Sequence, residues 1–211
     1  MKVTLRLYMD TEFTGLHKET TLISVGIVAE DNTYFYAEFL DYDETQLNDW
    51  LIENVVAKLK FKKPAEGAFP YYTRHRHQTP LMKEKGYRGF SIEMQGTKQT
   101  IREALTDWLE QFDTVEFVGD CCHFDFVLLL DLLADHVFDV TSHIAPVCFD
   151  INQALMIYYD CDSQAAFDLS RELLCEYMGA EIPTEEKHQA LYDAYVIKAI
   201  DEFLREEPQS Y

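Results

Sequence analysis

Two carboxylates separated by one residue stand near the start of the chain, in the stretch YMDTEFTGL (residues 8–16). Residues 2–9 alternate apolar and polar side chains, which predicts a β-strand running into this stretch. Residues i and i+2 of a strand face the same way, so Asp10 and Glu12 should point into one small volume. Like charges so close repel, and Mg²⁺ or Mn²⁺, which prefers carboxylate oxygen, would remove that conflict. The pair alone also fits two solvated acids at a strand end.

A third acid lies in GDCCHFDFVLLLDLL (residues 119–133). On a helix over 123–134, Asp125 shares a face with Leu128 and Leu132. An acid on such a buried stripe is costly unless it is paired or binds a metal. Asp120 is the competing candidate, and its position just after a strand also suits a helix cap. We favour Asp125 as the ligand.

The fourth acid is Asp193, in HQALYDAYVIKAI (residues 188–200). It lies in the apolar stripe of a predicted C-terminal helix, three residues after Ala190 and four before Ile197. Small alanines around it would let the helix approach a sheet closely. His188 precedes Asp193 by five residues, at the expected start of the helix, where a histidine taken alone also fits a cap or a surface position.

Taken together and in this order, the three motifs resemble the DEDDh 3′→5′ exonuclease superfamily, and in particular small stand-alone bacterial and phage exoribonucleases, ribonuclease T and oligoribonuclease. The matching positions are Asp10, Glu12, Asp125, His188 and Asp193. The resemblance implies a ribonuclease H-like fold and two Mg²⁺ or Mn²⁺ ions per active site, held by the four carboxylates. It also implies His188 as general base, release of nucleoside 5′-monophosphates from a 3′ end, and a homodimer.

The rest of the first motif suggests where a 3′-terminal nucleotide would bind. Gly15 lets the backbone approach the nucleotide closely, and Thr14 is a candidate hydrogen-bond partner of its sugar. Leu16 would wedge against the last base, as in superfamily members with TGL here, although it also fits an ordinary loop residue. Phe13 alternates away from the acids and is expected in the core.

A basic segment lies inside an otherwise acidic chain. Residues 58–102 carry eleven Lys or Arg against three acids, a net charge of +8 in a chain of net charge −20. Aromatic residues alternate with the basic ones, most densely in YYTRHRH (residues 71–77), so Arg74 and Arg76 are candidate contacts to the phosphates of an unpaired strand. The alternative is a solvated basic surface. The acidic remainder favours short substrates or short single-stranded tails.

These residues need a framework that brings distant segments together. Strands are expected at 2–9, 21–30, 33–40 and 115–119, with the turn EDN joining the second and third. Helices are expected over 45–60, 98–112, 123–134, 150–159, 167–178 and 186–206. The order predicts one α/β domain over 1–211, with a ribonuclease H-like mixed sheet (three antiparallel strands, then parallel strands) flanked by helices. Residues 61–96 are expected to form an irregular, basic insert.

Composition narrows the class further. The five cysteines are odd in number and fit no disulfide pattern, and the N-terminus enters a strand directly, so a reduced, cytoplasmic protein without membrane contact is expected. Cys121, Cys122 and His123 lack zinc-site spacing. Two functional alternatives to an exoribonuclease stay open. One is a 3′→5′ DNA exonuclease, since no residue in the sequence can be assigned to a contact with the 2′-hydroxyl of RNA. The other is a non-catalytic nucleic-acid-binding module.

Overall fold

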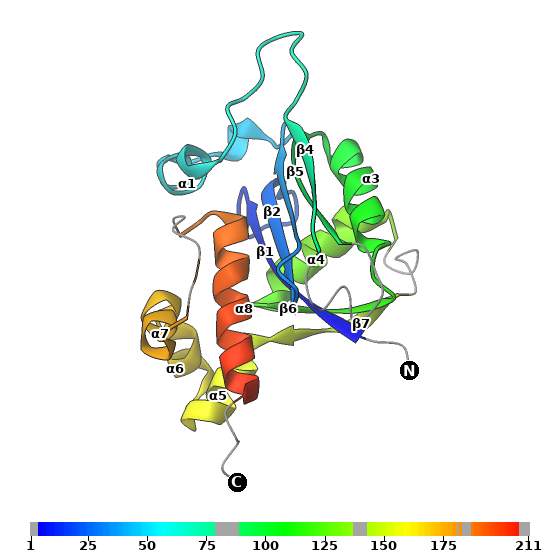
Figure 1. Ribbon diagram of the computed structural model, residues 1–211. Helices are drawn as coiled ribbons and strands as arrows, with labels where there is room; N and C mark the ends of the chain where they lie inside the picture. The colour runs from blue at the N-terminus through cyan, green and yellow to red at the C-terminus, as the bar shows by residue number, and fades with distance from the viewer. Residues whose placement is uncertain (1–3, 79–88, 137–142, 181, 183–186, 207–211) are drawn as a thin grey trace.

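The computed structural model describes residues 4–78, 89–136, 143–180, 182 and 187–206. Its framework is one seven-stranded mixed sheet in the order β4-β5-β3-β2-β1-β6-β7 (Figure 1). The strands are β1 (Thr4–Phe13), β2 (Leu22–Ala29), β3 (Tyr34–Phe39), β4 (Tyr72–Arg76), β5 (Phe90–Gly96), β6 (Thr114–Gly119) and β7 (Ile144–Asp150).

The strand pairing confirms the predicted mixed sheet. β1, β2 and β3 form an antiparallel meander, and β6 adds in parallel to the other side of β1. β7 then pairs in parallel with β6, β5 pairs in parallel with β3, and β4 closes the far edge antiparallel to β5. β1 therefore lies inside the sheet, with helices on both faces.

Alternation along β1 separates two cores. Leu7 and Met9 face a core shared with α3 (Lys98–Leu109) and α4 (Cys122–Leu133). Tyr8 faces a core shared with the C-terminal helix α8 (Ala190–Glu206) and with three shorter helices. These helices are α5 (Ile151–Tyr159), α6 (Ser163–Asp168) and α7 (Arg171–Met178). Side chains of even number on β1, including Asp10 and Glu12, therefore belong to the α8 side.

Five expectations about the elements were wrong in detail. The helix expected over 167–178 is split between α6 and α7, which are separated by Leu169 and Ser170. The helix expected over 45–60 is broken into the 3₁₀ turns η1 (Glu44–Gln46) and η2 (Val56–Lys58) around a short α1 (Asp49–Asn54). The insert expected to be irregular contains β4 and β5. β7 was not expected at all, and α8 begins at Ala190 rather than near 186. The parts of these expectations that fall on residues 2–3, 79–88 and 186 lie outside the described residues.

The missed strands have a physical explanation. β5 is buried throughout, but its alternate residues Ser91, Glu93 and Gln95 are polar, so it does not read as a core strand. Their polar groups are satisfied internally: the Ser91 hydroxyl accepts from the backbone of Tyr34, and Glu93 accepts from the Tyr34 hydroxyl. β7 contains a proline, which an edge strand tolerates because one side of it makes no ladder bonds. Among the described helices, none is long and apolar enough to cross a bilayer.

Candidate active site

The acidic pair of the first motif ends β1. Asp10 and Glu12 both line a cavity of about 290 Å³ on the α8 side, as their spacing predicts. The pairing of β1 with β2 becomes irregular between Glu12 and Phe13, where the chain leaves the sheet. Phe13 is half-buried and packs against the α3 and α4 core, as expected. The strand end therefore presents two carboxylates to the cavity.

Asp125 reaches the same cavity from the first turn of α4, where it is buried. One of its oxygens, Oδ1, accepts from the Thr11 backbone N–H at 3.0 Å and from the Thr11 hydroxyl at 2.5 Å. Thr11 lies between the two acids of β1 and points to the α4 side. It thereby fixes the Asp125 carboxylate relative to the acids of β1.

Asp193 lies in the first turn of α8, and His188 precedes that helix in a tight turn. The backbone N–H of His188 donates to Oδ2 of Asp193 at 2.8 Å. His188 has φ of 65°, a left-handed conformation that is uncommon for a residue other than glycine. The expectation that His188 begins the helix was therefore wrong, since it lies two residues before Ala190 in a backbone conformation that this hydrogen bond stabilises.

A glycine in β2 lets α8 come this close to the sheet. Gly26 pairs directly with Asp10 across the β1–β2 ladder. A Cβ atom added to Gly26 would lie 2.4 Å from backbone atoms of Ala190 and Leu191, at the start of α8. Only glycine fits at this crossing, so Gly26 is a positioning residue of the site that the sequence did not reveal.

The cavity gathers negative charge away from water. Burial is the main cause that raises the pKa of Glu12 to about 8, with the charges of Asp193 and Asp125 adding to it and Lys58 opposing. Burial likewise raises the pKa of Asp193 to about 7 and that of Asp125 to about 6, although the Thr11 hydrogen bonds oppose the shift of Asp125. The pKa of Asp10 lies well above its usual range, first through burial and then through the charges of four acidic neighbours, Asp125, Asp193, Glu12 and Asp120. Without a cation, this cluster holds protons at neutral pH.

Glu12, His188 and Asp193 can offer ligand atoms that all lie within 4.8 Å of one another. The pKa of His188 is lowered, first by burial and then by the charges of Lys187 and Lys58. The rings of His188 and Trp50 form a T-shaped pair, with centroids 5.1 Å apart and an interplanar angle of 75°. The imidazole is therefore neutral at pH 7 and is held beside the carboxylates.

The competing candidate Asp120 has partners at the cavity that the sequence analysis did not predict. Asp120 also lines it, and its carboxylate accepts from Nε of Arg171 at 2.7 Å. The Arg171 guanidinium also donates to the side-chain oxygen of Asn152, at 2.6 Å. The cap of α4 comes instead from Asp150, which accepts from the Cys122 backbone N–H, so the reading of Asp120 as the helix cap was wrong. Nothing in the local sequence pairs Asp120 with Arg171, which lies 51 residues away.

In the loop after Glu12, Thr14 has a structural role, whereas Gly15 and Leu16 border the acidic cavity. Thr14 is buried, and its hydroxyl donates to Gln46 at 2.5 Å and accepts from the Thr21 backbone at 2.9 Å, so it holds the loop together. Gly15 has φ of 155°, which an L-residue rarely adopts. Leu16 is 66% exposed and lines an apolar hollow of about 210 Å³ that shares Phe13 with the acidic cavity. Gly15 and Leu16 are thus placed next to the cavity.

Arg74 and Arg76 lie on β4, at the far edge of the sheet. The Arg74 guanidinium stacks on Phe90 at 3.5 Å from the ring centroid and pairs with Asp107 of α3 at 3.1 Å. Arg76 shares its side of the strand with Arg74. Both therefore face α3, on the side of the sheet opposite to the acidic cluster, and the fold does not bring them to it.

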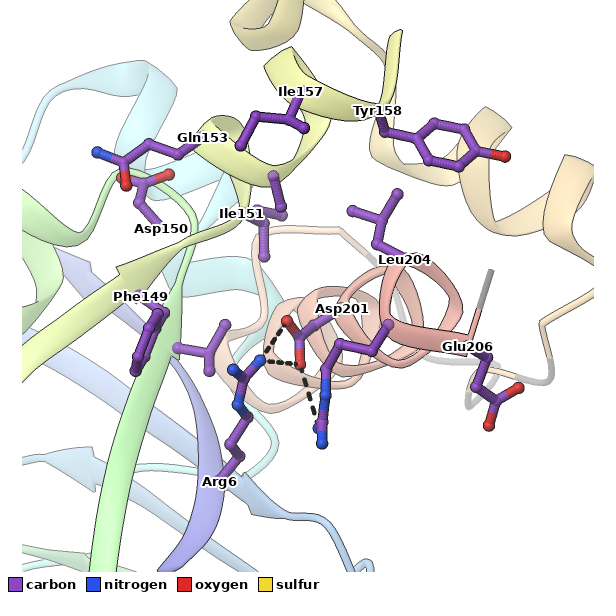
Figure 2. Close-up of a pocket in the computed structure, with 13 residues that line it drawn as sticks. Arg6, Phe149, Asp150, Ile151, Gln153, Ile157, Tyr158, Asp201, Leu204 and Glu206 are labelled. Atoms are coloured by element: carbon purple, nitrogen blue, oxygen red, sulfur yellow. Dashed lines mark hydrogen bonds and ion pairs between the residues drawn. The ribbon is translucent and has the colours of Figure 1, made fainter. Parts of the chain in front are cut away.

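A larger cavity of about 600 Å³ lies at the other end of α8 and β1, between α5, β7 and the last turns of α8 (Figure 2). Figure 2 shows Arg6 and Asp201 pointing toward each other in it, with Phe149, Ile157 and Leu204 around them. Arg6 donates to both oxygens of Asp201, at 2.7 and 2.9 Å, which ties β1 to α8. Among the described residues that line this cavity, none belongs to the acidic cluster.

The five cysteines, all within the described residues, carry free thiols. Burial raises the pKa of Cys121 and of Cys175 to about 11, so neither is a reactive thiolate at neutral pH. This agrees with the expectation of reduced cysteines.

Fold and site together define a ribonuclease H-like α/β domain with an acidic cluster at the end of its central strand. The Mg²⁺- and Mn²⁺-bound structure of S. pombe Pop2p matches with a TM-score of 0.54 and 15% identity, over 95% of this chain and 82% of that chain. A structure of the yeast NOT1 MIF4G domain co-crystallized with CAF1 matches with a TM-score of 0.51 and 11% identity, over 96% and 79% of the two chains. At these identities the likeness establishes the fold.

Similarity in sequence is shorter. The 3′-5′ exoribonucleases Rv2179c and MT2234.1 of Mycobacterium tuberculosis (strains ATCC 25618 / H37Rv and CDC 1551 / Oshkosh) are each 36% identical to this chain over 55 residues. That stretch is 26% of this chain, and the match spans about a third of the length of each relative. No family model matches the chain.

Proposed function

We propose that this protein is a metal-dependent 3′→5′ exoribonuclease that releases nucleoside 5′-monophosphates from single-stranded RNA or short 3′ tails. One observation carries the proposal. Asp10, Glu12, Asp125 and Asp193, from three distant segments, meet in one cavity together with His188. The short sequence match to two exoribonucleases supports the same conclusion. So does the order of the three motifs along the chain, which resembles that of the DEDDh exonucleases.

The donor set suits two Mg²⁺ or Mn²⁺ ions. All four acids offer hard oxygen ligands, and burial raises the pKa of each of them, with Lys58 and Lys187 opposing this only in part. The Pop2p structure of the same fold has Mg²⁺ and Mn²⁺ bound. Bound among these carboxylates, the ions would supply the Lewis acidity that activates water and stabilises the leaving oxygen of a phosphodiester.

The chain's own residues would handle the proton and the substrate. The imidazole of His188, neutral at pH 7 through its lowered pKa, accepts the proton of the attacking water. The hydrogen bond from its backbone to Asp193 holds it in position. Gly15 and Leu16 receive the 3′-terminal nucleotide, since they border the hollow that adjoins the acidic cavity. The hollow that they line is mainly apolar, which suits contact with the face of a base.

The proposal is tested with 5′-labelled RNA of 10 nucleotides or so, a metal titration and a sequencing gel. Stepwise shortening from the 3′ end is expected with Mg²⁺ or Mn²⁺, with nucleoside 5′-monophosphates as the product and arrest by EDTA. Asp125→Asn and Asp193→Asn should abolish it, whereas Glu53→Gln, an exposed acid of α1, should leave it unchanged.

Matched DNA and a binding assay separate the alternatives. Faster shortening of DNA than of RNA would assign the protein to the DNA exonucleases. Binding of RNA without release of nucleotides under any divalent metal would leave a non-catalytic module and refute the enzyme.

A further inference from the structure

Aromatic and basic side chains lie beside the acidic cavity, on the segment that follows β3. The segment formed by η1, α1 and η2 passes next to the N-terminal end of α8, as Figure 1 shows for α1. Trp50 of α1 is 52% exposed although its ring meets His188. Lys58 of η2 donates from Nζ to the backbone carbonyl of Lys187 at 2.8 Å, next to the proposed general base.

This line of side chains continues away from the cavity. Phe61 packs against the cluster that Leu191 and Ala194 of α8 form with β2 and β3. Tyr71 stacks on Phe61, with ring centroids 4.1 Å apart and an interplanar angle of 22°, yet 42% of it is exposed. An exposed tyrosine ring, held flat by another ring, presents a free face of the kind on which an unpaired base stacks.

The segment carrying these rings is fixed to the sheet. The buried Glu38 of β3 accepts from the backbone N–H groups of Lys60 and Phe61, at 2.6 and 3.1 Å. The backbone N–H of Gln95 donates to the carbonyl of Tyr71 at 2.8 Å. Because both ends are bonded to buried strands, the rings are pre-organised, which reduces the ordering cost of binding.

The two neighbouring tyrosines face opposite sides of the sheet. Tyr71 stacks on Phe61, which packs on the α8 side. Tyr72 shares its side of β4 with Arg74, which contacts Asp107 of α3. Tyr72 is 55% exposed, slightly more than Tyr71, so exposure alone does not distinguish the two. Only Tyr71 is on the side of the acidic cavity.

We propose that Trp50, Lys58, Phe61 and Tyr71 form a binding track for the nucleotides that precede the 3′-terminal one. The track rests on the proposed exonuclease function and narrows its substrate class: single-stranded RNA tails several nucleotides long bind better than dinucleotides. Lys58 supplies positive charge beside a phosphate, and Trp50 and Tyr71 supply stacking faces.

A length series tests the track. KM is measured for 5′-labelled RNAs of two, four and eight nucleotides with wild type, Tyr71→Ala, Tyr71→Phe and Tyr72→Ala. For the wild type, KM should fall as the RNA lengthens. Tyr71→Ala should raise KM for the eight-nucleotide RNA about tenfold, the effect of losing one modest stacking contact, and leave the dinucleotide KM and kcat unchanged. Tyr71→Phe and Tyr72→Ala should behave as wild type.

Binding without catalysis separates the track from the enzyme proposal. Fluorescence anisotropy in EDTA, with fluorescein-labelled eight-nucleotide RNA as the probe, should show about tenfold weaker binding for Tyr71→Ala and no change for Tyr72→Ala. Weaker binding by Tyr71→Ala alone would support the track even if the protein never releases a nucleotide. Failure to release nucleotides would refute the exonuclease proposal but not the track. Equal affinities and equal length dependence for Tyr71→Ala and wild type would overturn the track.

Discussion

Glu12 gives the sharpest test of the electrostatics of the acidic cluster. Its pKa is about 8 in the folded protein against an ordinary value of 4.5, chiefly because it is buried and lies among other acids. Between these values the folded state binds more protons than the unfolded state. The free energy of unfolding of the metal-free protein should therefore fall as pH rises through this window.

The size of the effect follows from the shift. At about 1.4 kcal/mol per pKa unit, Glu12 alone should destabilise the fold by roughly 3 kcal/mol more at pH 8 than at pH 5. Glu12→Gln keeps the shape of the side chain and removes its charge. Its stability in EDTA should therefore exceed that of wild type at pH 8 by about this amount, and the two proteins should be similar at pH 5.

Urea denaturation in EDTA at pH 5, 6, 7 and 8 measures the effect, with Glu53→Gln as the control for general charge repulsion. Saturating Mg²⁺ or Mn²⁺ should raise the stability of the wild type most at pH 8, by about 2.7 kcal/mol at a hundredfold excess over Kd, and that of Glu12→Gln less. Two results would refute the reasoning. One is that the free energies of unfolding of wild type and Glu12→Gln change with pH in parallel. The other is that the free energies of unfolding of both wild type and Glu53→Gln rise from pH 5 to pH 8.

Three further predictions concern the positioning of the site. His188→Ala should lower kcat by about 10²- to 10⁴-fold and leave Mn²⁺ affinity by calorimetry nearly unchanged; a comparable loss of metal affinity would make His188 a ligand instead. Gly26→Ala should cost about 1–3 kcal/mol in thermal unfolding and about 100-fold in kcat, because its Cβ would displace α8 at Ala190; wild-type activity would contradict the close approach. Asp201→Asn should cost about 3 kcal/mol, because the partly buried Arg6 then keeps only its longer ion pair with Glu116, at 4.0 Å; urea denaturation measures it, and a cost below 1 kcal/mol would show that the Arg6–Asp201 pair does not anchor α8.

Local patterns predicted most of the framework. The alternation of β1, the turn between β2 and β3, and the apolar stripes of α3, α4 and α8 are set by neighbours in sequence, so the periodicity of the side chains reports them. β5 failed this test because its polar residues are satisfied by partners elsewhere in the chain, such as the Tyr34 hydroxyl that donates to Glu93. The prediction of one helix over 45–60 was wrong because 3₁₀ turns replace the α-helix on both sides of α1, although the apolar residues keep a helical spacing.

The sequence by itself determined which residue types are available for chemistry: two acids at a strand end, an acid on each of two apolar helix faces, and a histidine just before the last helix. Tertiary structure decided that they meet. Gly26 admits α8 to the sheet, Thr11 fixes Asp125, and the left-handed turn at His188 is stabilised by Asp193. It also decided that Tyr71 lies on the side of the site and Arg74 does not. These features depend on which atoms pack together across long sequence separations, and such contacts leave no periodic signal in the chain.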